Sequence, residues 1–444
     1  MNKEIQDLKN KYAFLDLHLI DFFGKLKTIS LPTSYIDENV IKQGIGFDAS
    51  NLNYSEVTKS DLVIIPEMAT LKSNPFSDLP CATAFGNIGH FPSENSAPEI
   101  FPFDPRWMVR QAALHLKEKG YAYQLMVLPE LEFYLFSQQD YSLASDDNFI
   151  QISYDEAIVN QSKGYHSSSP FDAFPDVRMH MVQELENAGI PVKYHHHEVG
   201  LPGQCEIELD FLPLEKAADA IIMGKHIVRN VAHEFQLVAN FMPKPMYGLP
   251  GSGMHLHMYL VNDKGESLFF DENNKYRLSK QGMYFMGGIL RHLGAIMAFS
   301  NATTNSYKRL ISGYEAPQDK SFAKSSRNAA IRIPAYTRLE ETRFEYRTAD
   351  AACNPYYTLI ALLLAGMDGI EHKIDPENPE QIKINEDIPR NLFDALDALK
   401  HDHQFLMPLI GESFILEWIR KKAKEAELPN NYPNPAEFDI YSNY

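Results

Sequence analysis

The alternation of apolar and polar positions divides the 444-residue chain into two parts of different character. From residue 12 to about 100, short apolar runs such as "AFLDLHLIDFF" and "LVIIPEM" are separated by turn signals, which is typical of a small strand-rich domain. The proline-rich stretch "FPSENSAPEIFPFDPR" follows, and helical spacing then covers residues 106–120. We therefore expect a small domain at 1–103 and a larger one at 104–444.

The larger part mixes helices with strands along its whole length. Apolar residues recur at helical spacing in three long segments, and they alternate with polar residues in four shorter ones. Such a mixture predicts an α+β domain. The helical segments are 177–189, 214–235 and 282–300, and the strand segments are 124–136, 205–211, 254–260 and 343–347.

The four strand segments share an unusual polar face. Side chains two residues apart lie on the same face of a β-strand. One such strand is ordinary surface, whereas four with Glu, His and Arg and almost no Lys, Ser or Thr indicate the lining of one cavity. The side chains on these faces are Glu130 and Glu132, Glu206 and Glu208, His255 and His257, and Arg343, Glu345 and Arg347.

Several carboxylates in one cavity would protonate or repel one another unless cations neutralise them. A donor set rich in oxygen, with a minority of imidazole, suits Mg²⁺ or Mn²⁺ better than Zn²⁺. Arginines beside metal-binding carboxylates then indicate a substrate with phosphate or carboxylate groups. Phosphoryl transfer is the reaction class that these residues favour, because its catalysis depends on positioning and on neutralisation of charge.

Composition narrows the alternatives. The formal net charge of -18 argues against nucleic acid as a partner, because phosphate-backbone binding needs a basic surface. The longest apolar run, "LIALLLAGM", is shorter than the roughly 20 residues of a membrane span, and the N-terminal residues "MNKEIQDLKN" lack an apolar signal segment. Three scattered cysteines favour neither disulfides nor a thiolate zinc site. We expect a cytoplasmic protein.

Two further motifs carry less information. "GIGFDA" fits a dinucleotide fingerprint, but the residues after it do not open a helix, and the chain has no P-loop sequence. In "HHHE", His195 to Glu198, adjacent side chains cannot all face one ion, so at most one or two of them could be ligands.

Six ordered segments resemble the successive signatures of type I glutamine synthetase, and the resemblance covers nearly the whole chain. They are "PELEFYLF", "YHHHEVGLPGQCEIE", "FMPKPMYGLPGSGMHLH", "NSYKRLISGYEAP", "RNAAIRIP" and "RFEYRTADAACNPY". The length is similar to that of the shorter, unadenylylated branch, and Phe393 stands where the adenylylated branch has its target tyrosine.

The resemblance implies a fold and an activity. It implies an N-terminal β-grasp domain, a catalytic domain with a curved antiparallel sheet flanked by helices, and a homo-dodecamer of two hexameric rings with active sites between neighbouring subunits. It also implies that ATP phosphorylates the γ-carboxylate of glutamate and that ammonia then attacks the γ-glutamyl phosphate.

The resemblance also implies roles for individual residues, matched motif by motif. One metal ion would be held by Glu132, Glu198 and Glu206, and a second by Glu130, His255 and Glu345. The residues at the glutamate side would be Gly251, His255, Arg309 and Arg347. Those at the phosphates and the nucleotide would be Arg327, Arg332, His257 and Arg343. Glu315 on a flap and Asp48 from a neighbouring subunit would deprotonate ammonium, which is unreactive until it loses a proton.

Some positions depart from the family pattern, mainly around the ammonium pocket, the glutamate loop and the nucleotide rim. Asn51 replaces a serine, Pro250 replaces an asparagine before G-S-G, and Ser312 replaces a proline. Phe322 lies in a stretch that usually contains tryptophan, and Glu56 stands where the short branch has a feedback-sensing arginine. Lys193 and Glu340 stand where ATP-side residues of opposite charge are common.

Three functions remain open on the sequence. The first is glutamine synthesis from ATP, glutamate and ammonia, which the retention of Asp48 and Glu315 favours. The second is a γ-glutamyl ligase of the same fold that uses methylamine, ethanolamine or a polyamine, which Asn51, Pro250 and Ser312 favour. The third is a catalytically weak paralogue with a regulatory or structural role, which the complete set of metal ligands disfavours.

Overall fold

The computed structural model describes residues 2–55, 60–93, 96–144, 147–154 and 164–432, together with 434 and 437. Glu56 lies outside them. The chain forms two compact units, residues 1–111 with 187–189 and residues 112–186 with 190–444. The domain boundary between 103 and 104 stays a prediction.

The smaller unit is the expected β-grasp domain, a sheet with strand order β2-β1-β6-β4-β3, to which β5 and β7 add on β6. Strand β1 pairs antiparallel with β2 and parallel with β6. Its leucines at 15, 17 and 19 are buried, because alternate residues face the core. The elements are α1 (Asn2–Lys11), β1 (Phe14–Ile20), β2 (Leu26–Pro32), α2 (Glu38–Gln43), β3 (Ile45–Asp48), β4 (Asp61–Pro66), β5 (Lys72–Ser73), β6 (Cys81–His90) and β7 (Glu99–Ile100), with α3 (Pro105–Glu118) after them.

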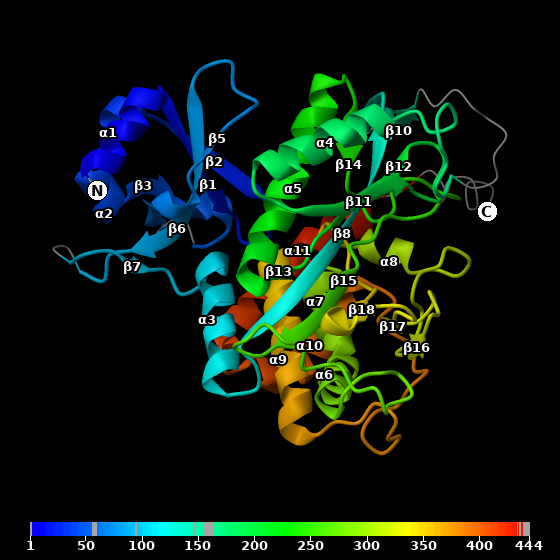
Figure 1. Ribbon diagram of the computed structural model, residues 1–444. Helices are drawn as coiled ribbons and strands as arrows, with labels where there is room; N and C mark the ends of the chain where they lie inside the picture. The colour runs from blue at the N-terminus through cyan, green and yellow to red at the C-terminus, as the bar shows by residue number, and fades with distance from the viewer. Residues whose placement is uncertain are drawn as a thin grey trace. The chain divides into compact units, whose positions relative to one another are not determined.

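The larger unit is built on a nine-stranded sheet with order β11-β12-β8-β15-β18-β17-β16, to which β13 and β14 add on β8. Strand β8 is long and central in this sheet (Figure 1), and its residues from Val127 to Phe136 are buried. The fold class predicted from the sequence is confirmed. The strands are β8 (Gln124–Phe136), β11 (Val192–His197), β12 (Gln204–Leu209), β13 (Leu212–Pro213), β14 (Val238–Asn240), β15 (Leu256–Val261), β16 (Phe322–Lys324), β17 (Ile331–Ile333) and β18 (Phe344–Tyr346).

Helices complete the larger unit, and α5 packs on β8 while α6 packs on α9. A Cβ on Gly288 would lie 2.0 Å from the carbonyl oxygen of Ala365, so only glycine lets α6 and α9 approach so closely. No helix of the described residues is long and apolar enough to cross a membrane. The helices are α4 (Pro175–Asn187), α5 (Leu214–Glu234), α6 (Lys280–Arg291), α7 (Leu293–Ser300), α8 (Ser306–Arg309), α9 (Pro355–His372), α10 (Leu392–His401) and α11 (Glu412–Asn431).

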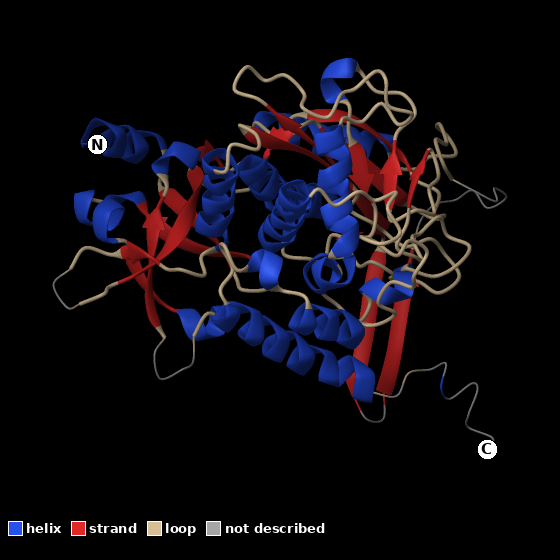
Figure 2. Ribbon diagram, turned by 90° about the horizontal axis from the view of Figure 1, so that it is seen from below, coloured by secondary structure: helices blue, strands red, loops and turns tan. Residues whose placement is uncertain are grey.

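A separate hairpin, β9 (Gln138–Ala144) with β10 (Asp147–Ser153), follows β8 and was not expected from the sequence. Figure 2 shows it as two long strands beside the end of α11, where the Tyr432 hydroxyl donates to the carbonyl oxygen of Leu143. Tyr141 and Ile150 on this hairpin are 66% and 71% exposed. The hairpin therefore leaves large apolar side chains open to solvent.

Candidate metal and substrate site

The registers of four neighbouring strands bring the predicted polar faces together. Glu206 on β12 lies opposite Glu132 on β8, and Glu208 lies opposite Glu130. His257 on β15 lies opposite Glu345 on β18. The alternation extends past the strand ends, since His255 precedes β15, and Arg343 and Arg347 flank β18.

The first group of possible ligands consists of Glu132, Glu198 and Glu206, and one carboxylate oxygen of each lies within 4.8 Å of those of the other two. Burial and the charge of Glu132 raise the pKa of Glu198 well above its usual value. Burial and the charges of Glu130 and Glu132 do the same to Glu206. Negative charge is thus concentrated here, and a cation between the oxygens would relieve it.

The second group centres on His255. Its Nδ1 lies 2.6 Å from Oε2 of Glu130. The same nitrogen lies 3.6 Å from Oε1 of Glu132 and 3.6 Å from Oε1 of Glu345. His255 Nε2 lies 3.4 Å from a guanidinium nitrogen of Arg309, which can only donate, so Nδ1 carries the proton that faces the carboxylates. The predicted ligands Glu130 and Glu345 therefore both lie near His255 Nδ1, and this nitrogen must lose its proton before it can bind an ion.

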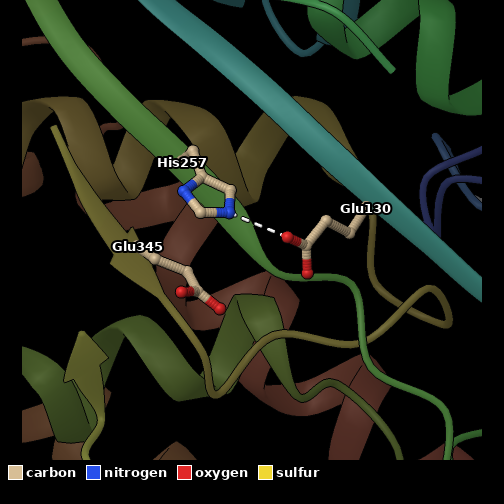
Figure 3. A group of neighbouring side chains, drawn as sticks. All are labelled: Glu130, His257 and Glu345. Atoms are coloured by element: carbon tan, nitrogen blue, oxygen red, sulfur yellow. Dashed lines mark hydrogen bonds and ion pairs between the residues drawn. The ribbon is translucent and has the colours of Figure 1, made fainter. Parts of the chain in front are cut away.

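His257 supports Glu130 from the other side. Arg343 Nε donates to His257 Nδ1 at 3.2 Å, so His257 Nε2 carries the proton and donates to Oε1 of Glu130 at 2.8 Å (Figure 3). Burial alone would raise the pKa of Glu130, but the hydrogen bonds from His255 and His257 lower it well below the usual value. In this arrangement His257 orients a ligand, although it also lies close enough to Glu130 and Glu345 to bind an ion itself.

This donor set fits a divalent cation that prefers oxygen. Buried carboxylates supply most of the donors, one imidazole nitrogen faces three of them, and the described residues of the cluster include no thiol. Such a mixture suits Mg²⁺ or Mn²⁺.

Two arginines bond to the carboxylate of Glu345. Arg332 Nε and Arg347 Nη1 each donate to one of its carboxylate oxygens. Glu345 is fully buried, which would raise its pKa, but the charges of Arg347 and His257 lower it instead. Arg347 also donates to the backbone carbonyls of Arg327 and Glu315, so this guanidinium ties the cluster to two loops.

Arg309 is held in place by the backbone around it. Its guanidinium donates to the carbonyl oxygen of Thr348 at 2.7 Å and to that of Arg347 at 3.0 Å. A Cβ on Gly251 would lie 2.7 Å from Arg309 Cγ, and one on Gly253 would lie 2.5 Å from Arg309 Nη2. The G-S-G motif is therefore needed for the loop to lie against this arginine. The Gly253 N–H also donates to Glu132 at 2.7 Å.

Arg327 and Glu315 lie at exposed positions of the larger unit. Tyr165, Glu345 and Glu315 all act electrostatically on Arg327 and raise its pKa, although burial opposes the shift. Glu315 has a backbone φ of 56°, which a non-glycine residue rarely adopts. Charged groups thus meet at the rim of the cluster.

Asp48 belongs to the smaller unit, at the end of β3. Ser50 donates to its Oδ1 from both the backbone and the hydroxyl, and Asn51 donates to its Oδ2 at 2.7 Å. The hydrogen bonds from Ser50 are the main cause of its lowered pKa. Asn51, the residue that departs from the family pattern, therefore supports Asp48 directly.

Two neighbours of the site were not assigned from the sequence. Glu208 forms a third group of possible ligands with Glu130 and Glu206, and Lys193 Nζ lies 2.6 Å from it. The spacing of Glu206 and Glu208 was visible in the sequence, but the contact between Glu208 and Lys193 was not. Tyr165 interacts electrostatically with Arg327 and Glu198, and no pattern around it signalled this.

The chain matches two protein-family models. Residues 102–441 match the catalytic domain of glutamine synthetase, and residues 11–89 match its β-grasp domain.

The chain is also similar to individual proteins along almost its whole length. It is 35% identical to glutamine synthetase from Haemophilus influenzae, over 98% of this chain and 96% of that protein. It is 35% identical to glutamine synthetase from Sulfolobus acidocaldarius, over 97% and 96%. The cryo-EM structure of Plasmodium falciparum glutamine synthetase superposes with a TM-score of 0.89 at 26% identity, over 99% of this chain and 97% of that one.

Proposed function

The chain belongs to the glutamine synthetase family, and from this premise we propose that it is an ATP-dependent ligase that forms glutamine from glutamate and ammonia. The observation that carries the proposal is the buried cluster of carboxylates and histidines with arginines around it. Phosphorylation of the γ-carboxylate needs this kind of site, because charge must be neutralised on both the nucleotide and the acid.

Two divalent ions, Mg²⁺ or Mn²⁺, are proposed for this cluster. Glu132, Glu198 and Glu206 would hold one of them, which their mutual repulsion supports. The other ligand set is Glu130, His255 and Glu345. When bound, the ions would neutralise charge on the transferred phosphoryl group and on the glutamate carboxylate.

Arginines would bind the anionic parts of the substrates. We assign Arg309 and Arg347, with Gly251 and the neighbouring His255, to glutamate. The backbone bonds of Arg309 hold its guanidinium in one orientation before substrate arrives.

The residues assigned to the phosphates and the nucleotide are Arg327, Arg332, His257 and Arg343. Arg343 already fixes the proton of His257, so loss of Arg343 would also disturb Glu130.

Asp48 and Glu315 are proposed to attract ammonium and to accept its proton, after which ammonia attacks the γ-carbonyl carbon and phosphate leaves. The charge of the Asp48 carboxylate supports the attraction of ammonium, whereas its lowered pKa makes it a weaker proton acceptor than an ordinary aspartate. Asp48 would come from a neighbouring subunit.

Several finer assignments rest on the resemblance. We propose the short, unadenylylated type I branch, for which Phe393, 41% exposed on α10, is the supporting residue. We also propose a homo-dodecamer of two hexameric rings in the cytoplasm, and a domain boundary between 103 and 104. The apolar side chains exposed on the β9–β10 hairpin support assembly, because a second subunit would cover them.

A coupled ATPase assay with glutamate and a panel of amines tests the function. We expect ammonium to give the highest kcat/KM and glutamine to be the product. A strong preference for methylamine, ethanolamine or a polyamine would show that the acceptor is an organic amine rather than ammonia. Absence of Mn²⁺ or Mg²⁺ binding by the folded protein in calorimetry would indicate a weak paralogue.

A further inference from the structure

A buried lysine joins the glutamate-binding loop to the segment that carries Glu315. Lys244 is 8% exposed and lies just after β14. Its ammonium donates to the carbonyl oxygen of Leu249 within the loop. The same ammonium lies 3.8 Å from the centre of the Tyr314 ring, one residue before Glu315.

The loop from Pro243 to Ser252 has fixed ends. The Ser252 N–H donates to the carbonyl oxygen of Pro243 at 2.9 Å and closes the loop. The Tyr134 hydroxyl on β8 donates to the carbonyl oxygen of Pro250 at 2.7 Å, and Gln204 on β12 donates to that of Gly251 at 3.0 Å. The glutamate side of the loop is therefore attached to the strands that carry the metal ligands.

The backbone of Lys244 is fixed as well. Its N–H donates to Oδ1 of Asn305 at 2.7 Å, and Nδ2 of Asn305 donates back to its carbonyl oxygen at 3.0 Å. The side chain thus starts from a rigid point, and its ammonium has two contacts, one in the loop and one on Tyr314.

The segment around Glu315 is less firmly attached. Residues 311–313 and Glu315 are exposed, Tyr314 is half-buried, and the Glu315 carbonyl accepts a long bond of 3.4 Å from Arg347. The face of an aromatic ring attracts an ammonium, and the attraction grows when water is excluded. Among the described residues, Lys244 is therefore a main contact that holds Tyr314 in place.

We propose that Lys244 is a positioning residue that couples the glutamate-binding loop to closure of the Tyr314–Glu315 segment over the γ-glutamyl phosphate. This inference rests on the proposed function. When glutamate orders the loop, the Leu249 carbonyl holds the ammonium under the Tyr314 ring, and Glu315 is kept over the reacting carbon. Lys244 itself does not touch the reacting atoms.

Loss of this coupling would admit water. A water oxygen then bonds to the γ-carbonyl carbon, the bond from that carbon to the phosphate oxygen breaks, and phosphate leaves with the electron pair. One proton of the water passes to the phosphate and the other to solvent. The products are glutamate and phosphate, so ATP is consumed without glutamine. The ratio of glutamine formed to ATP hydrolysed therefore measures the coupling.

The test compares Lys244→Met with Lys244→Arg in the full-length protein with Mn²⁺ or Mg²⁺. Lys244→Met keeps the apolar stem and removes the charge, and we expect the ratio of glutamine to ATP to fall about threefold to tenfold. Lys244→Arg keeps a cation that can stack on the ring, and it should restore most of the ratio. An unchanged ratio in Lys244→Met would overturn the proposal.

Variants of Tyr314 keep the test decisive if Lys244→Met does not fold. Tyr314→Phe retains the ring face and should couple like the wild type, whereas Tyr314→Leu should lower the ratio. Combining Tyr314→Leu with Lys244→Met should add little further loss, because both remove the same contact. A Tyr314→Leu protein with wild-type coupling contradicts the inference. A wild-type protein that forms no glutamine would instead contradict the proposed function.

Discussion

Glu206 lies directly opposite Glu132 in the antiparallel register of β12 and β8, although both side chains are carboxylates and both are buried. Like charges at such positions destabilise a sheet. Burial, together with the charges of Glu130 and Glu132, raises the pKa of Glu206 well above its usual value. Because folding alone does not relieve the repulsion, metal binding should stabilise this sheet strongly.

Glu206→Gln should separate the stability of the metal-free protein from its response to metal. Removing one charge relieves the repulsion with Glu132, so we expect Tm without metal to be equal to or above that of the wild type. The rise in Tm on adding Mn²⁺ should largely disappear. For the wild type, Mn²⁺ at about 100 times its Kd adds about 2.7 kcal/mol per site. Thermal melts with and without Mn²⁺ measure both effects.

Asp210→Asn is the matched control for Glu206→Gln, because Asp210 is exposed just after β12. It should keep the full response to Mn²⁺. If Mn²⁺ still raises the Tm of Glu206→Gln as much as that of the wild type, Glu206 is not a metal ligand.

Glu345→Ala should abolish turnover. The substitution removes a proposed ligand and leaves Arg332 and Arg347 without the carboxylate that they share. We expect kcat to fall by at least about a thousandfold, since metal neutralisation of transition-state charge contributes several kcal/mol. Steady-state kinetics with saturating metal measure it, with Glu272→Ala, an exposed glutamate in a turn, as the control. Wild-type-like activity in Glu345→Ala would refute the site assignment.

Gly253→Ala should impair glutamate binding. The added Cβ would lie 2.5 Å from Arg309 Nη2 and 3.0 Å from His255 Nε2, so the guanidinium must move. We expect KM for glutamate to rise about tenfold or more, because small displacements of positioning groups are costly. Gly411→Ala, where a Cβ meets nothing within 4 Å, should leave KM unchanged. An unchanged KM in Gly253→Ala would show that Arg309 does not bind glutamate.

Local periodicity accounts for the part of the site that could be predicted from the sequence. The alternation around Glu130 and Glu132 is a property of one strand, and it indicated a polar face before any partner was known. The contacts of Lys244 depend instead on Asn305, 61 residues away, which no local pattern reports. The β9–β10 hairpin was missed because "QQDYSLA" has only two large apolar side chains in alternation, Tyr141 and Leu143, which is too short a pattern to predict a strand.

A buried histidine outside the metal and substrate site gives a pH-dependent prediction. His292, at the end of α6, bonds through Nδ1 to Asp402 at 2.9 Å and through Nε2 to Asp368 at 3.0 Å. Burial opposes the charged imidazolium, but these carboxylates outweigh it and raise the pKa of His292. A raised folded-state pKa means that the stabilisation is complete below the unfolded value of about 6.5 and is lost as pH rises through the folded value.

His292→Gln should therefore lower Tm most at about pH 6 and progressively less towards about pH 9. Glutamine can bond to one aspartate but carries no charge, so it lacks the part of the stabilisation that depends on protonation. Thermal melts of both proteins across this range measure the difference. His372→Gln is the control, because His372 is 61% exposed at its side chain and contacts Asp368 only at the helix surface. A difference in Tm between wild type and His292→Gln that stays constant with pH would show that His292 contributes packing rather than charge.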